Sequence, residues 1–338
     1  MKRYLRQIAL FFSPLFAVLL LYVIMDPFRV LREYEVYYTS GEADYVVLNR
    51  GYVGTETFVQ QHPRHRYDSF IFGNSRSLFW QVRDWQPLLH AGASCFHMDG
   101  SDESLYNVHR KIRYLDAEGV RIRQALLVLD FSLLGRAEAQ TGHLTATPPR
   151  LTGYRNILSF HGAFLLAYLD PRFLLAYYDF SVFGTYREYM RDHNVLNAEP
   201  MAYDARTNEI RYPQFEHAIE TGTYYTGKRK ALFYKRRTDI PSSPACIGPT
   251  QLRLLTDIRD IVERQGSVLH VVVSPLYNQR ALHARDRATL QEVFGMQCVH
   301  DYSGVNDITE DFRNYYELSH YRPHVAARIM REIYATEK

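Results

Sequence analysis

Short apolar runs, each ended by a polar residue or a glycine, alternate with segments of helical periodicity in the first half of the chain. The runs predict buried strands, and apolar residues at helical spacing predict amphipathic helices. The predicted strands cover residues 68–72, 94–98 and 125–129, and the predicted helices cover residues 76–90 and 103–118. Asp102 is the expected N-terminal cap of the second helix. Strands that alternate with helices in this way predict a parallel sheet covered by helices.

The same alternation returns near the C-terminus. Predicted helices cover residues 251–264, 281–293 and 323–334, and predicted strands cover residues 268–273 and 297–302. Residues 140–248 interrupt the pattern because they contain many prolines and no regular strand–helix alternation. We therefore expect a three-layer α/β/α domain formed by residues 67–139 and 249–338. Between them, residues 140–248 would form a mostly helical insertion or lid.

One part of this insertion, residues 157–184, is strongly apolar and aromatic. We expect a pair of helices packed on the core, and the alternative is a lid or a hairpin that rests on a membrane. A second membrane span is excluded because Asp170, Pro171 and Arg172 divide the segment into halves that are too short to cross a bilayer.

The N-terminal segment predicts the compartment. Residues 8–25 carry no formal charge, and at about 1.5 Å per residue a helix of this length spans ~27 Å, just enough for a bilayer core. Basic residues within residues 1–7 favour a cytoplasmic tail. We therefore predict a single-pass anchor in the inner membrane, with the bulk of the chain in the periplasm. A cleavable signal peptide is the alternative, but no small-residue cleavage site follows Met25.

Residues 26–66, which are rich in Tyr, Gly and charge, are expected to form a stalk with irregular β structure. The overall charge excludes one class of function. Lys and Arg total 40 and Asp and Glu total 37, so the net charge is only +3, whereas a nucleic-acid binder needs a dense basic surface. The 3 Cys exclude a scaffold held by several disulfides, and no Cys/His pair has the spacing of a zinc site. We expect no metal and no organic cofactor.

Two loops at predicted strand ends carry candidate chemistry, and the carboxyl ends of parallel strands are where α/β sheets place their sites. Gly73 permits a tight turn, after which Ser75 would expose its hydroxyl and its N–H near a helix N-terminus. These are the requirements of a serine nucleophile and half of an oxyanion hole. Before the last helix, His320 is a candidate general base, and Glu317 could hold its tautomer. The alternative is that Ser75 and His320 only cap helices.

These residues carry a resemblance to a known family. The turn Gly73-Asn74-Ser75 resembles the Gly-Asp-Ser block of the SGNH (GDSL-type) hydrolase superfamily, and Glu317-x-x-His320 resembles its terminal Asp-x-x-His block. The N-terminal anchor and the residues around His320 are similar to the membrane-anchored branch. That branch includes the D-alanyl transfer proteins of teichoic acids and the alginate and peptidoglycan O-acetyltransferases. The resemblance covers roughly residues 66–135 and 250–336 and implies a flavodoxin-like, SGNH-type fold.

The resemblance implies roles residue by residue. Ser75 matches the nucleophile, and its N–H matches one oxyanion donor. His320 matches the general base, and Glu317 matches the acid that orients it, with Asp307 and Asp311 as alternatives for this last role. Gly100 is the best match to the glycine whose N–H is the second donor.

The chain departs from the family at two positions. Asn74 replaces an Asp beside the nucleophile, which removes a charge. The third family block supplies an Asn side chain after the third strand, but here the strand ends in Asp130, whose carboxylate would repel an oxyanion. Loss of one such donor typically costs about 3–4 kcal/mol of transition-state stabilisation.

Further residues are candidates for substrate binding. Arg76 would bind an anionic group such as phosphate or uronate, or form an ion pair within the protein. His143 would contact substrate, and Tyr321 would shape the cleft beside His320. His97, near Gly100, is expected to be a partly exposed histidine with its hydrogen bonds satisfied.

Together these features predict a membrane-anchored, extracytoplasmic serine esterase or O-acyltransferase. It would act on cell-envelope carbohydrate or an exopolysaccharide through an acyl-Ser75 intermediate. The expected partners are the cell membrane, an acylated envelope polymer and a multi-pass membrane acyltransferase, and no nucleic acid. One alternative is a non-catalytic accessory partner of such an acyltransferase or of a polymer-export complex. Another is a lipid esterase that uses residues 157–184 as an interfacial lid.

Overall fold

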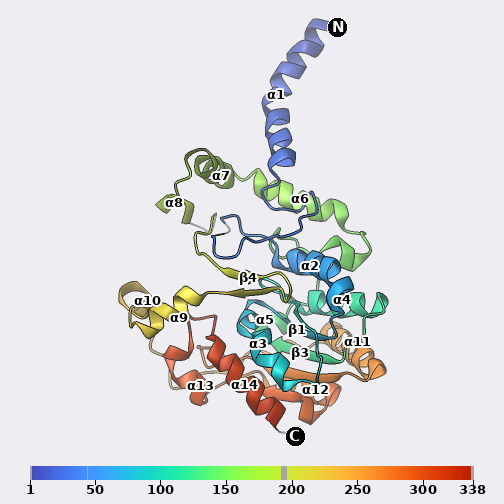
Figure 1. Ribbon diagram of the computed structural model, residues 1–338, viewed down its shortest axis with the longest axis vertical. Helices are drawn as coiled ribbons and strands as arrows, with labels where there is room; N and C mark the ends of the chain where they lie inside the picture. Colours follow the sequence, from blue (N-terminus) through green and yellow to red (C-terminus); the bar gives the residue numbers. More distant parts are fainter. Residues whose placement is uncertain (1, 44, 192–195, 336–338) are drawn as a thin grey trace.

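The computed structural model describes residues 2–43, 45–191 and 196–335 (Figure 1). Five strands form a parallel sheet in the order β2-β1-β3-β6-β7. Their bounds are β1 (Ser69–Gly73), β2 (Cys95–His97), β3 (Gln124–Leu129), β6 (Val268–Val273) and β7 (Val299–Asp301). In the register, Phe70 lies opposite both Phe96 and Ala125, and Leu126 lies opposite His270. Every residue of β1 is buried, as expected for a parallel strand that has helices on both sides.

Helices pack on both faces of this sheet. On one face lie α4 (Leu105–Ala117), α11 (Pro249–Gln265) and α12 (Ala284–Phe294), whose apolar residues pack against Phe70, Phe72 and Leu127. On the other face lie α3 (Val82–Trp85) and α14 (Pro323–Ala335), which pack against Ile71 and Val128. The prediction of an α/β fold with a parallel sheet is confirmed, and the arrangement is compatible with three layers, α/β/α.

Several local expectations differ from the structure. Residues 76–90 do not form one helix but three short pieces, which are the 3-10 helix η1 (Ser75–Phe79), α3 and the 3-10 helix η2 (Gln86–Leu88). Pro87 near the start of η2 favours such a break, because it lacks an N–H for helical hydrogen bonding. The cap of α4 is Ser104 rather than Asp102, since the Ser104 hydroxyl accepts the N–H of Asn107 at 3.1 Å.

The segment expected to be an irregular stalk contains a helix, α2 (Arg50–His65), whose N-cap Asn49 accepts the N–H of Tyr52 at 2.9 Å. Gly51, Gly54 and several β-branched residues lower its helix propensity, which concealed it in the sequence. Burial of its first half against the rest of the protein stabilises it.

The remaining elements are short and belong mostly to residues 131–247 and 296–314. They are α5 (Phe131–Leu134), η3 (Pro149–Thr152), α8 (Glu188–Arg191), β4 (Ala202–Asp204), β5 (Glu209–Arg211), α9 (Pro213–Glu220), α10 (Gly227–Leu232), η5 (Met296–Cys298), α13 (Asp307–Glu310) and η6 (Phe312–Asn314). The strands β4 and β5 form an antiparallel hairpin, so the insertion is not helical throughout.

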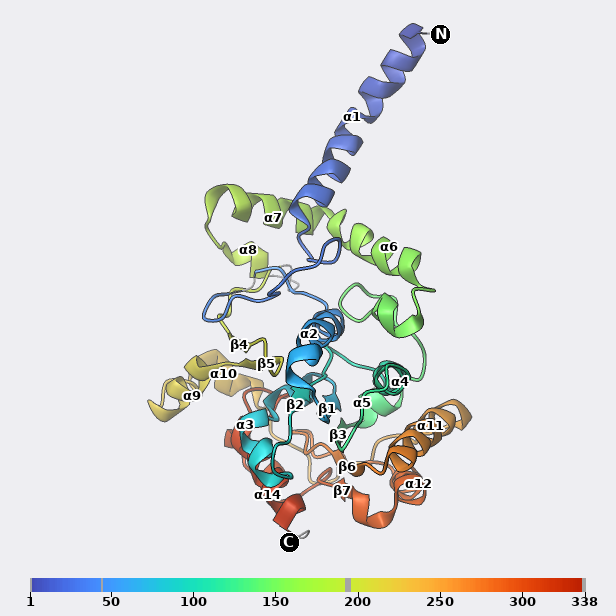
Figure 2. The same ribbon diagram turned by 45° about the vertical axis from the view of Figure 1, so that its right-hand side comes forward.

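The predicted helical pair is present as α6 (Ile157–Tyr168) and α7 (Pro171–Phe183). It does not pack on the sheet. Its buried residues Phe160, Phe164 and Phe173 instead form a separate cluster with Tyr22 and Phe28 from the N-terminal segment. Figures 1 and 2 show both helices lying across the foot of α1 (Lys2–Met25), on the side of the molecule away from the C-terminus.

Within the described ranges, none of the helices combines the length and the apolar character needed to cross a membrane. The structure therefore gives no support to the span predicted for residues 8–25, which stays a prediction.

Candidate active site

The structure brings together three residues that the sequence proposed as a catalytic triad. The Ser75 hydroxyl lies 2.9 Å from Nε2 of His320. The other ring nitrogen of His320, Nδ1, forms a short hydrogen bond with the Glu317 carboxylate. A carboxylate can only accept, so Nδ1 carries the proton and Nε2 is left to accept from the Ser75 hydroxyl. This is the chain of hydrogen bonds that a serine nucleophile, a general base and an orienting acid require.

The turn after β1 exposes Ser75 because Gly73 allows the chain to pass very close to its neighbours. A Cβ at Gly73 would lie 2.7 Å from the Val128 carbonyl oxygen and 2.8 Å from Cβ of Ser77, so no larger residue fits there. Asn74 then accepts the N–H of Arg76 at 3.0 Å and begins the short helix η1. Ser75 is the first residue of η1, at the carboxyl end of β1, as the sequence predicted.

The loop that carries His320 is held at both sides. Tyr321 is fully buried, and its hydroxyl accepts a hydrogen bond from the Trp80 indole. Arg322 forms an ion pair with Glu216 of α9 in the insertion, with Nε 3.0 Å from Oε1. The expectation that Tyr321 shapes the cleft was wrong, because its side chain lies inside the core and fixes the loop from behind.

Glu317, rather than one of the other two candidate acids, faces His320. Burial alone would raise the pKa of the Glu317 carboxyl, but the hydrogen bond and the charge interaction with His320 outweigh burial and lower that pKa. The carboxyl is therefore ionised at neutral pH. Asp307 pairs with Arg328, and Asp311 pairs with Arg313, so both alternatives are engaged elsewhere.

Gly100 does not offer its N–H to a substrate, because that N–H donates to the carbonyl of Gly73 at 3.1 Å. The assignment of Gly100 as an oxyanion donor was therefore wrong. The next residue, Ser101, lines the same cavity as Ser75. Among the described residues, neither the Ser75 N–H nor the Ser101 N–H has a hydrogen-bond partner. These two backbone groups are the candidate oxyanion donors of the site.

A buried ion pair fixes the loop on which Ser101 lies. The Lys111 ammonium is almost completely buried, donates to the carbonyls of Met98 at 3.1 Å and Asp99 at 2.8 Å, and pairs closely with Glu103. The Glu103 carboxylate passes directly over Gly100, where a Cβ would collide with it. Gly100 is thus needed for this close approach rather than for its N–H.

Asp130 does not line the cavity that adjoins Ser75. Its carboxylate accepts hydrogen bonds from the Asn74 amide, from Arg76 at 2.8 Å and from the backbone N–H groups of Ser132 and Leu133 at 2.7 and 3.1 Å. Burial raises the pKa of Asp130, but the Arg76 guanidinium and these hydrogen bonds outweigh burial and lower it. Asp130 is therefore a stable anion that holds Asn74 and Arg76 on either side of Ser75. Of the two roles considered for Arg76, the ion pair is the one present.

Two other histidines lie away from the triad. His143 packs against the rings of Phe28 and Phe164, with centroids 5.3 and 5.9 Å away, and lines a cavity beside α6 and α7. The structure does not bring it to Ser75. His97 is fully buried rather than partly exposed, and its Nε2 lies 3.3 Å from the Ser77 hydroxyl.

A small cavity of about 110 Å³ adjoins the nucleophile. Its apolar lining comes from Tyr38, Val46, Val47, Leu48, Leu78, Met201, Ile210 and Tyr212. Most of these residues belong to the expected stalk or to the insertion, and sequence reasoning missed them. A buried ion pair, Arg50 with Asp99 at 2.9 Å, lies at the cavity wall, and Arg50 also donates to Asn208 at 2.9 Å. These contacts tie the sheet to the segments around it.

Within the described ranges, no group of His, Cys, Asp and Glu side chains could hold a metal ion. No protein-family model, no curated protein and no solved structure matches this chain.

Proposed function

We propose that the chain is a serine esterase or O-acyltransferase of the SGNH type that works through an acyl-Ser75 intermediate. One observation carries the proposal: Ser75 Oγ lies 2.9 Å from His320 Nε2, while Glu317 engages the other ring nitrogen. Helix capping alone would not require this order of three groups. The parallel sheet, with Ser75 at the end of β1 and His320 just before α14, also supports the assignment.

The reaction has two steps. In the first, His320 Nε2 takes the proton of Ser75 while Oγ attacks the carbonyl carbon of an ester. The resulting oxyanion is stabilised by the N–H groups of Ser75 and Ser101, and His320 then protonates the departing alcohol. In the second step, His320 activates either water or a sugar hydroxyl, which attacks the acyl-Ser75 carbonyl and releases the acid or a new ester. The two outcomes share the same intermediate.

The small cavity beside Ser75 supports a short acyl group. Its volume of about 110 Å³ is small beside the roughly 300–1,000 Å³ of typical ligand pockets. Its apolar lining suits a methyl or short alkyl group, and Ser75 and Ser101, which carry the candidate oxyanion donors, are among its lining residues. A short acyl group such as acetyl is therefore the one we propose for this site.

The polymer substrate and the compartment rest on the resemblance and on the apolar N-terminal segment. A membrane anchor would keep Ser75 beside a lipid-linked polymer or a membrane-bound acyl donor, which favours transfer to envelope carbohydrate over general esterase activity. Coupling to a multi-pass acyltransferase is part of this proposal.

A fluorophosphonate probe tests the proposal directly, since it reacts only with an activated serine. The wild-type chain should be labelled, and Ser75→Ala should abolish labelling. Ser242→Ala removes an exposed serine outside the site and should be labelled like the wild type. Equal labelling of Ser75→Ala would exclude Ser75 as the nucleophile. Full complementation in cells by Ser75→Ala would favour the non-catalytic accessory role.

A further inference from the structure

The helices α6 and α7 carry an outer face that the described residues leave uncovered. We call it the hairpin face, and it consists of Leu158, Leu166, Leu175, Val182 and Phe183, all strongly exposed. Leu158 is 87% exposed. A surface helix normally carries polar residues on its outer side, but α6 has no charged residue at all. Several large exposed apolar side chains on one pair of helices indicate an interaction site.

The exposure does not arise from loose packing of the two helices. Their inner sides are buried, with Phe160, Phe164 and Ala176 in one cluster with Tyr22 and Phe28. The Tyr168 hydroxyl also donates to the carbonyl of Val18 in α1 at 3.2 Å. The pair is therefore fixed to the foot of α1 by its inner side, and this orientation leaves the hairpin face outward.

The surroundings indicate what covers the hairpin face. Figures 1 and 2 show α6 and α7 lying across the foot of α1. Along α1 the exposed side chains are almost all apolar, for example Phe11, Phe16 and Leu20. The two helices that carry the hairpin face thus lie at the base of a helix whose exposed side chains are mostly apolar.

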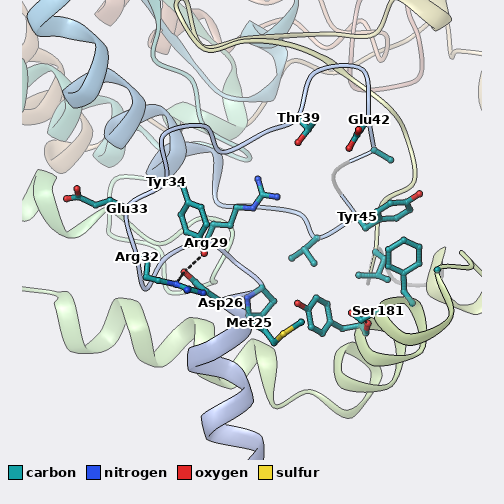
Figure 3. Close-up of a pocket in the computed structure, with 17 residues that line it drawn as sticks. Met25, Asp26, Arg29, Arg32, Glu33, Tyr34, Thr39, Glu42, Tyr45 and Ser181 are labelled. Atoms are coloured by element: carbon teal, nitrogen blue, oxygen red, sulfur yellow. Dashed lines mark hydrogen bonds and ion pairs between the residues drawn. The ribbon is translucent and has the colours of Figure 1, made fainter.

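The polarity changes just beyond these helices. At the foot of α1 lies a cavity of about 870 Å³ whose lining includes Asp26, Arg29, Arg32, Glu33 and Glu42 (Figure 3). In Figure 3, Tyr45 and Ser181 lie across this cavity from Asp26, Arg32 and Glu33, and Glu42 lies on the same side as Tyr45. Moving from α1 toward the sheet, the first element is an apolar helix. Next comes a helical pair that is mostly apolar but carries Arg172 and Asp179 in α7, and then a charged cavity. This is the order of acyl chains, boundary and head groups in a lipid bilayer.

We propose that the hairpin face lies flat on a lipid bilayer, at the boundary between acyl chains and head groups. Tyrosines suit this level because they combine an apolar ring with a polar hydroxyl, and exposed Tyr154 and Tyr189 lie near the two ends of the hairpin. The charged cavity of Figure 3 then lies at the depth of the head groups. The proposal concerns a surface remote from Ser75 and does not depend on the reaction proposed for that residue.

Tryptophan fluorescence of the full chain tests this contact. The two natural tryptophans, Trp80 and Trp85, are fully buried and give a background that lipid cannot reach. Leu166→Trp and Val182→Trp place a reporter on the hairpin face. Met296→Trp is the matched control, because Met296 is 74% exposed near β7, on the opposite side of the molecule. Each variant is mixed with vesicles of phosphatidylcholine and phosphatidylglycerol, with and without bromine on the acyl chains.

Interfacial helices bury their apolar side about 5–10 Å into the boundary between acyl chains and head groups. Bromine near the carbonyl end of the acyl chains should therefore quench the fluorescence of the tryptophan introduced by Leu166→Trp or Val182→Trp roughly twofold. The emission of Met296→Trp should not change. Equal tryptophan emission with and without bromine at both hairpin positions would overturn the proposal. A protein that does not bind the vesicles at all would also overturn it. Protection of both positions from bromine and from aqueous acrylamide would also overturn it and would indicate a protein partner.

Discussion

Glu317 engages Nδ1 of His320 from a position three residues earlier on the same loop. The hydrogen bond makes Nδ1 the donor and leaves Nε2 free to accept the Ser75 proton. The local spacing matters because the acid and the base move together as one loop. That loop is in turn held by Tyr321 inside the core and by Arg322 on α9. The geometry of the base is therefore determined before substrate arrives.

Glu317→Gln should lower kcat for ester cleavage by about two to four orders of magnitude while folding is retained. The amide no longer stabilises the imidazolium that forms in the transition state, and it can favour the wrong tautomer. Steady-state hydrolysis of a short-chain aryl ester measures the effect. Asp311→Asn is the matched control, since Asp311 pairs only with the nearby Arg313 at the surface. If Asp311→Asn lowered kcat as much as Glu317→Gln, Glu317 would not be the orienting acid.

The cavity beside Ser75 should set the length of the acyl group. Ile210→Ala removes three carbons from its wall, and we expect the ratio of kcat/KM for butyryl over acetyl esters to rise roughly tenfold or more. Ile219→Ala in α9, which does not line this cavity, should leave the ratio unchanged. The ratio is insensitive to the amount of folded enzyme, so a loss of stability does not mimic the effect. An unchanged ratio in Ile210→Ala would place the acyl group elsewhere.

The buried pair of Lys111 and Glu103 should be important for stability as well as for the position of Ser101. Lys111→Met leaves Glu103 buried without a counter-charge, and we expect the free energy of unfolding to fall by about 3–5 kcal/mol. In a double-mutant cycle with Glu103→Gln, the coupling should be about 1–3 kcal/mol. Urea unfolding gives both values.

An exposed ion pair between the same helix, α4, and α11 serves as the comparison for Lys111. Arg113 lies 3.5 Å from Asp257, and Arg113→Met should cost less than about 1 kcal/mol, because solvent screens such pairs. A similar loss of stability in Arg113→Met and Lys111→Met would show that the burial of Lys111 has no special effect.

Much of the sheet could be predicted from the sequence because its strands are continuous apolar runs that end in polar residues. Ser75 and His320 were found by the same argument, since both follow from their places near strand ends and not from any contact between them. The geometry that joins them arises from the order of strands, which brings the end of β1 and the loop before α14 to one edge.

The other residues of the site have no comparable pattern in the sequence. The cavity wall depends on pairings between distant segments, such as Ile210 and Tyr38, and no periodicity relates residues so far apart. The role of Lys111 was also hidden, because it lies on an ordinary amphipathic helix where a lysine is expected to face water. Gly100 was assigned to the right loop but to the wrong role, because the direction of a single N–H depends on details of backbone geometry.

As the pH falls below neutral, the buried imidazole of His97 should lower the stability of the folded protein. Burial lowers the pKa of its imidazole from 6.5 to about 4. The unfolded chain therefore binds a proton on this residue as the pH falls below about 6.5, whereas the folded chain does not until about pH 4. The contribution of His97 to stability is therefore complete above about pH 6.5. It is lost progressively as the pH falls from there to about 4. The total loss is about 3 kcal/mol.

Urea unfolding at several values between about pH 7 and 5 should therefore show a stability that declines with falling pH, and His97→Gln should reduce the decline. The decline should not vanish, because burial also lowers the pKa of His270 to about 4. His217→Gln, at an exposed position in α9, is the matched control and should keep the slope of the wild type. Parallel curves for His97→Gln and the wild type would mean that His97 is not held neutral in the folded protein.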